Sequence, residues 1–172
     1  MAENITTPNQ ESQRQTVYVV YGHDTDTIPK IEAFLEGLGL KFLKKERAVD
    51  LIEDGNTAPF IGQVIDIAFE HAQAVIVLLT GEEDVQLCKE FQRNDEDDFE
   101  KVFSPQPTQE QIFEAGYAFG KSPKRTILVQ IGHVRSFSDI IGIHILHFTN
   151  TPEDYAILRT RLERAGCSIK KV

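Results

Sequence analysis

The stretch "AQAVIVLLT" at residues 72–80 decides the fold class. It contains the unbroken apolar run "AVIVLL" (74–79), which is rich in β-branched residues, and Gly81 follows the stretch. A run of this kind predicts a strand that is buried on both faces, as in the middle of a parallel sheet. It falls well short of the ~18 apolar residues that a membrane-spanning helix needs.

Strand-like and helix-like segments alternate on both sides of this run. Four further strands are predicted at 16–21, 40–45, 125–132 and 142–148. Four helices are predicted from apolar spacing at 25–40, 58–71, 108–121 and 151–166. This alternation predicts an α/β fold: a three-layer sandwich with a five-stranded, mainly parallel sheet and right-handed crossovers.

Helix-terminating residues support two of these helices. Pro29 falls in the first turn of the 25–40 helix, and Gly39 is a plausible C-cap. In the last helix, Thr151 is the expected N-cap, Pro152 the first helical residue and Gly166 the residue after the end. Proline near the start and glycine past the end are typical of α-helices.

The domain organisation predicted from the sequence is simple. Residues 1–15 are polar and are predicted to form a disordered tail. Residues 16–172 are predicted to form a single domain, a usual size for one core. Within it, residues 82–105 are weakly periodic and are predicted to be an acidic insertion, because 82–101 holds nine acidic and three basic residues.

Composition excludes several classes of function. The formal net charge of −9 argues against nucleic acid as the main partner, because phosphate binding needs a basic surface. The polar N-terminus lacks the apolar core of a secretory signal, and no segment is long and apolar enough to span a membrane. Cys88 and Cys167 make no disulfide framework, which predicts a reduced, cytoplasmic setting.

A ligand site is expected where the carboxyl ends of the strands meet. "YGHD" (21–24) follows the first strand, "TGEED" (80–84) follows the third, and the helix at 108–121 packs nearby. Gly22 and Gly81 would let backbone N–H groups approach a phosphate or a ribose, although both could simply end their strands. The glycine patterns of classical dinucleotide and P-loop sites are absent.

The helix at 108–121 contains "QIFEAGYAFGK" (111–121), in which Glu114 stands among apolar and small residues. The positions expected to face the sheet are Ile112, Phe113, Gly116 and Phe119 or Gly120. Glu114 would then share the other face with Glu110 and Tyr117. Periodicity alone therefore favours a solvated carboxylate over a functional one.

Other kinds of catalytic site have little support. His144 and His147 fall on opposite faces of one predicted strand, so no metal site is predicted. No G-x-S-x-G elbow is present, and Cys88 lies in the polar insertion, which disfavours a serine or cysteine nucleophile.

Four segments in this order resemble a known family. They are "VYVVYGHD" (17–24), "AVIVLLTGEED" (74–84), "IFEAGYAFGK" (112–121) and "SFSDIIGI" (136–143). They are similar to the bacterial TIR-like, predicted nucleotide-binding domains that act as effectors in cyclic-nucleotide antiphage systems of the CBASS and Pycsar type. The resemblance covers about residues 16–166 and implies a TIR/flavodoxin-like fold. One departure is "TQEQ" (108–111), where family members often carry a polar R-x-N-type stretch.

The resemblance also implies a function. The family cleaves NAD to nicotinamide and ADP-ribose or cyclic ADP-ribose, and its essential glutamate corresponds to Glu114. NAD is then the substrate, and no cofactor is expected. The residues implied to line the NAD pocket are Tyr21, Gly22, His23, Asp24, Thr80, Gly81 and Tyr117.

Assembly is a further implication of the resemblance. Such effectors are activated by oligomerisation through TIR–TIR contacts, which often involve the loop that corresponds to 46–57. A sensor for a cyclic-nucleotide signal is often fused to them. This chain has no room for one, so we expect either an excised domain or a sensor that acts in trans.

Two alternatives remain open from the sequence. The first is a non-catalytic TIR adaptor, which has no use for a carboxylate at Glu114. The second is a nucleoside deoxyribosyltransferase-like enzyme, because its E-x-G-Y-A stretch resembles "EAGYA" (114–118) and supplies a carboxylate nucleophile.

Overall fold

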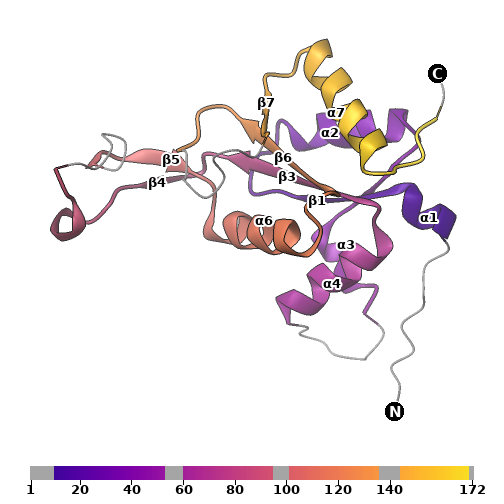
Figure 1. Ribbon diagram of the computed structural model, residues 1–172, viewed down its shortest axis with the longest axis horizontal. Helices are drawn as coiled ribbons and strands as arrows, with labels where there is room; N and C mark the ends of the chain where they lie inside the picture. Colours follow the sequence, from indigo (N-terminus) through magenta and orange to yellow (C-terminus); the bar gives the residue numbers. More distant parts are fainter. Residues whose placement is uncertain (1–9, 53–59, 95–100, 136–143, 171–172) are drawn as a thin grey trace.

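A five-stranded parallel sheet forms the centre of the molecule (Figure 1). The structure is a computed structural model, which describes residues 10–52, 60–94, 101–135 and 144–170. The strand order is β2-β1-β3-β6-β7, and every neighbouring pair is parallel. The strands are β1 (Thr16–Val20), β2 (Lys41–Leu43), β3 (Ala74–Thr80), β6 (Thr126–Ile131) and β7 (Leu146–Phe148). This arrangement confirms the predicted α/β fold class.

Helices cover both faces of the sheet (Figure 1). Helices α2 (Ile28–Gly37) and α7 (Pro152–Arg164) lie on one face, and α3 (Lys45–Val49), α4 (Ile61–His71) and α6 (Gln109–Lys121) lie on the other. Each face has its own apolar core, one built around Ile31 and Leu158 and the other around Ile65 and Phe69. These are the three predicted layers.

The decisive run at 72–80 is the middle strand, β3. All seven of its residues are buried, and it pairs with β1 on one side and β6 on the other. Since the strands are parallel, the end of β3 at Thr80 lies at the same end of the sheet as the end of β1 at Val20. The loops after these two strands therefore meet there, as the sequence predicts.

Several element bounds differ from those expected. The second strand ends at Leu43 because Lys45 begins α3, and β7 covers only Leu146–Phe148 of the strand expected at 142–148. Part of the predicted disordered tail is helical, since Gln10–Arg14 forms α1 and the Arg14 carbonyl accepts a hydrogen bond from Ser168 N. Residues 1–9 and 142–143 lie outside the described residues.

The acidic segment begins and ends in a small antiparallel sheet that extends beyond the main one (Figure 1). Strand β4 (Glu83–Val85) pairs with β5 (Ser104–Gln106), and a short 3-10 helix, η1 (Lys89–Phe91), follows β4. Three-residue strands are too short to give a recognisable alternation, which explains the weak periodicity of the sequence here. Residues 95–100 lie outside the described part of the chain.

Thr151 is the N-cap of α7, as predicted, and it forms a capping box with Asp154. The Thr151 side chain accepts a hydrogen bond from Asp154 N, and the Asp154 carboxylate accepts one from Thr151 N at 3.0 Å. The same carboxylate accepts hydrogen bonds from Thr149 N and Oγ1 at 2.8 and 2.9 Å. These bonds, first from Thr151 and then from Thr149, lower the pKa of Asp154 to about 2. Gly166, which follows the helix, has a φ of +94°, as expected for a residue past a helix end.

Asp154→Asn should lower stability in a pH-dependent way. The folded pKa of about 2 lies below the ~3.9 of an unfolded aspartate, so the ionised group stabilises the fold above pH ~4. That contribution is lost as the pH falls from about 4 towards 2. Urea unfolding should therefore show a wild-type advantage at pH 7 that shrinks by pH 2.5. An advantage that is unchanged across this range would contradict the assigned role of the charge.

None of the helices in the described part of the chain has the length and apolarity that a membrane span requires.

Candidate active site

Glu114 is buried, contrary to the expectation from periodicity alone. It is 4% exposed and lies on the face of α6 that packs on the sheet, together with Gln111, Ala115 and Ala118. Phe113, which was expected to face the sheet, is 55% exposed. The helix packs its small residues inward because alanine lets the helix approach the sheet closely, and the neighbouring Gln111 and Glu114 are carried inward with them.

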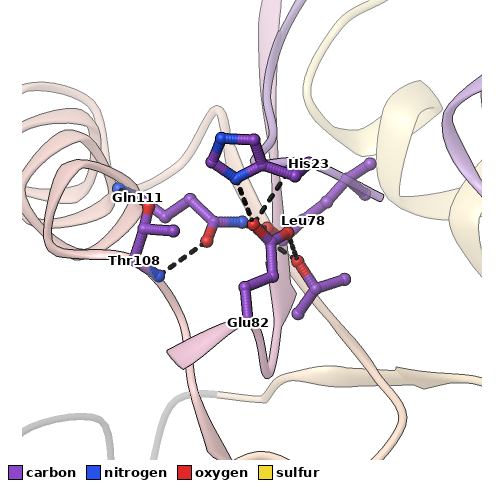
Figure 2. A network of polar contacts seen from close by, with 6 residues as sticks. His23, Leu78, Glu82, Thr108 and Gln111 are labelled. Atoms are coloured by element: carbon purple, nitrogen blue, oxygen red, sulfur yellow. Dashed lines mark hydrogen bonds and ion pairs between the residues drawn. The ribbon is translucent and has the colours of Figure 1, made fainter. Parts of the chain in front are cut away.

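Hydrogen bonds fix the first turn of α6 against β3 (Figure 2). Gln111 is 2% exposed, and its amide donates to the Leu78 carbonyl at 2.9 Å and to Thr80 Oγ1 at 3.2 Å. The side-chain oxygen of Gln111, Oε1, accepts a hydrogen bond from Thr108 N at 2.8 Å. This bond completes a capping box, because the Thr108 hydroxyl accepts one from Gln111 N. The hydrogen bonds of Gln111 therefore hold α6 in place on the sheet. Because Glu114 follows about one turn later on the same helix, these bonds also position Glu114.

A cavity of about 140 Å³ borders Glu114 at the carboxyl end of β1. It is lined by Tyr18, Val19, Val20, Tyr21, Gly22, Lys45, Glu46, Glu110, Gln111 and Glu114. Three residues predicted from sequence for the site, Glu114, Tyr21 and Gly22, thus lie around one cavity. Its volume is below the ~300 Å³ at which pockets for drug-sized ligands begin, so it has room for one ring of a larger ligand.

Lys45 forms an ion pair with the buried carboxylate. Its Nζ lies 2.6 Å from Glu114 Oε1, and its side chain is 42% exposed whereas that of Glu114 is 6% exposed. Lys45 was not predicted as a site residue from the sequence. Its position shortly after β2, at the same end of the parallel sheet as the loop after β1, was the available signal.

Tyr18 was also missed, because it stands in the apolar strand "TVYVVY" (16–21) and reads as a core residue. It is fully buried and its ring belongs to the core between β1 and α6. Burial, and then the negative charge of Glu114, raise the pKa of Tyr18. The phenol therefore keeps its proton at neutral pH and remains a hydrogen-bond donor.

A second carboxylate, that of Glu82 in the loop after β3, contacts His23 in the loop after β1 (Figure 2). It accepts hydrogen bonds from His23 N at 2.8 Å and from the Thr80 hydroxyl, and it lies 2.9 Å from His23 Nδ1. A Cβ placed on Gly22 would overlap this carboxylate, so a side chain at this position would require the Glu82 carboxylate to move. Although burial opposes it, the hydrogen bonds from Thr80 and His23 lower the pKa of Glu82.

The remaining predicted residues lie outside the cavity lining. Asp24 Oδ1 accepts from the Asp26 and Thr27 backbone N–H groups just before α2. A Cβ on Gly81 would meet Pro105 and the His133 carbonyl, so Gly81 packs against protein. The Tyr117 hydroxyl donates to Asp66 at 2.8 Å. The predicted ligand contacts of these three residues stay predictions.

Chemically, the site offers one buried anion, a partly exposed cation and a neutral phenol around a small space. Among the described residues, no group of three or more His, Cys, Asp or Glu side chains is arranged to hold a metal ion. A fixed carboxylate in such a setting can stabilise positive charge that develops on a bound ligand.

The comparison with protein families decides the identity of the domain. Residues 16–150 match the model of the CAP12/Pycsar effector protein TIR domain. The chain belongs to this TIR family. A comparison with curated proteins found no match.

The match confirms the resemblance on which the expectations from sequence depend: this is a bacterial TIR-like domain of the antiphage effector type. It extends over β1, α3 and α6, the elements that contribute residues to the cavity lining. Two stretches that carried expectations fall wholly or partly outside the described residues. The motif "SFSDIIGI" (136–143) lies entirely outside them, and so do residues 53–57 of the segment at 46–57.

Proposed function

We propose that this TIR domain hydrolyses NAD⁺ at the bond between nicotinamide and ribose, with Glu114 as the catalytic residue, and that it does so as an assembly-activated antiphage effector. The observation that carries the proposal is the burial of Glu114 beside a cavity at the carboxyl ends of the strands. The ion pair with Lys45 compensates the charge of this buried carboxylate, and its place on the wall of a cavity, where a ligand can reach it, makes it a candidate functional group.

The proposed reaction needs charge stabilisation at one carbon atom. The bond between the anomeric carbon and the pyridinium nitrogen breaks, and its electron pair goes to the nitrogen, so nicotinamide leaves as a neutral molecule without needing a proton. The ribose becomes oxocarbenium-like and positively charged. The Glu114 carboxylate stabilises this charge, water then bonds to the anomeric carbon, and a proton is released to solvent.

The size of the cavity bears on how NAD would bind. About 140 Å³ accommodates the reacting ribose or the nicotinamide but not a whole dinucleotide. The other parts of the substrate would then lie over the loops after β1 and β3. Glu82 already occupies the His23 amide there, so a phosphate that uses this amide has to displace the Glu82 carboxylate.

The alternatives predict different results. An adaptor that acts only through assembly needs no buried carboxylate beside a cavity, so the surroundings of Glu114 favour an enzyme. A deoxyribosyltransferase-like enzyme would use the same carboxylate as a nucleophile and would exchange bases between nucleosides. Incubation with a nucleoside and a free base separates that activity from NAD cleavage.

The test is nicotinamide release from NAD by concentrated protein, with and without a crowding agent that forces clustering. We expect release that rises steeply with clustering. Absence of release under forced clustering, from protein whose thermal unfolding shows that it is folded, would refute the proposed function. Base exchange without nicotinamide release would support the nucleoside enzyme instead.

A further inference from the structure

The Tyr18 hydroxyl is the most unusual polar group of the described structure. Tyr18 is 0% exposed, and its hydroxyl has no hydrogen-bond partner among the described residues. Buried polar groups almost always have partners, and one that lacks a partner needs an explanation. A core position would accept phenylalanine without this penalty, so the hydroxyl calls for a role that the folded chain alone does not supply.

The position of Tyr18 indicates where that role is exercised. The residue lines the cavity together with Glu114 and Lys45. Glu114 raises the pKa of the phenol through its charge and through a side-chain contact with the hydroxyl, but this contact falls short of full hydrogen-bond geometry, so the hydroxyl has no satisfied partner. The nearby polar groups have other partners: Lys45 bonds to Glu114, and Gln111 bonds to Leu78, Thr80 and Thr108.

The chemistry of the position restricts the ligand group that would fill it. A neutral phenol both donates and accepts one hydrogen bond, which suits an uncharged hydroxyl group. A phosphate at this point would be repelled by the Glu114 carboxylate. The cavity has room for one ring, and a sugar ring presents hydroxyl groups on its rim.

We infer that the Tyr18 hydroxyl binds a hydroxyl group of the ribose whose anomeric carbon faces Glu114. This inference rests on the proposed function for the identity of the sugar. Tyr18 thereby selects a hydroxylated ring for the cavity and sets its orientation beside the carboxylate. A site that hydrogen-bonds a ligand hydroxyl discriminates strongly against ligands that lack it.

Tyr18→Phe tests the inference, because it removes the hydroxyl and leaves the ring. Binding of ADP-ribose and of ADP is measured by calorimetry; ADP lacks the second ribose. Loss of one neutral hydrogen bond should weaken ADP-ribose binding by about 5- to 10-fold and leave ADP binding unchanged. The melting temperature should stay the same or rise, since an unpartnered buried hydroxyl is removed.

Tyr155→Phe is the matched control. Tyr155 lies in α7 on the other face of the sheet, and its hydroxyl donates to Asn150 at 2.7 Å. This variant should bind both ligands like the wild type and should unfold at a slightly lower temperature. It shows what loss of a partnered tyrosine hydroxyl does to the same protein.

Three results would overturn the inference: unchanged ADP-ribose affinity in Tyr18→Phe, an equal loss of affinity for ADP and ADP-ribose, or no binding of ADP-ribose to the wild type. Failure of the proposed function gives a different result. Tyr18-dependent binding of ADP-ribose without nicotinamide release under clustering would refute NAD cleavage and leave the ribose contact standing.

Discussion

Glu114→Gln should reduce nicotinamide release by at least about 10²–10³-fold, the usual effect of removing a group that stabilises transition-state charge. Glutamine has nearly the same shape, and its oxygen can still accept a hydrogen bond from Lys45. The substitution therefore removes the negative charge while disturbing the packing of α6 little. The rate under forced clustering and the melting temperature are the two measurements.

The control for this prediction is Glu163→Gln. Glu163 is on α7, and its side chain, which pairs with Arg159 at 3.2 Å, is 51% exposed. Exposed pairs of this kind contribute little to stability, about 0–1 kcal/mol, so both the rate and the fold should stay close to wild type. Full activity in a folded Glu114→Gln variant would remove Glu114 from the mechanism.

Lys45→Met should lower the stability of the protein and raise its rate of nicotinamide release. Without Lys45 the Glu114 carboxylate is left buried without the cation that faces it. Losing one partner of a fully buried pair costs about 3–5 kcal/mol. The Lys45 side chain is 42% exposed, however, so we expect about 2 kcal/mol, or a melting temperature lower by about 4–8 °C.

The rate should change in the opposite direction for an electrostatic reason. A cation 2.6 Å from Glu114 Oε1 weakens the negative field that stabilises the cationic ribose. Removing it should increase nicotinamide release by about 10-fold, equivalent to about 1.4 kcal/mol, a modest share of the Coulomb energy of charges ~5 Å apart near a protein surface. Loss of stability with gain of activity is a recognised trade-off at active sites.

Lys44→Met is the control, because it makes the same change one residue earlier. Lys44 pairs with Glu32 at 3.2 Å and is absent from the cavity lining. It should leave the rate unchanged. If Lys45→Met slowed the reaction instead, Lys45 would be needed to position Glu114. The inference that Lys45 disfavours the developing positive charge would then be wrong.

Much of the fold could be predicted because its signals are local. The apolar run at 72–80 identified the central strand, and Gly39 and Gly166, both with positive φ, end α2 and α7 as expected. The short elements were less predictable. Three-residue strands such as β4 and β5 contain too few positions to establish a period of two, and they form because they pair with each other.

The site was predicted only in part, because its geometry depends on contacts between distant residues. Glu114 was selected by its resemblance to a family motif, while periodicity pointed its side chain to solvent. What reverses that orientation is the packing of Ala115 and Ala118 and the bonds from Gln111 to β3. Neither effect can be predicted from the spacing of large apolar residues along the helix.

The partners of Glu114 show the same limitation. Lys45 is 69 residues away along the chain, so only the parallel order of β2 and β1 brings it to the carboxylate. Tyr18 resembles its aliphatic neighbours in β1, and its importance lies in one hydroxyl group without a partner. Spacing in a sequence does not reveal whether a buried group is satisfied.

The outermost strands of the sheet, β2 and β7, contain three residues each. Edge strands this short can form only a few backbone hydrogen bonds with a strand of another chain. Short edge strands are one way in which proteins avoid unwanted strand addition. If the proposed assembly forms, its copies should therefore join through the side chains of helices and loops. Each copy would then keep its own complete sheet, and dispersal would restore intact monomers.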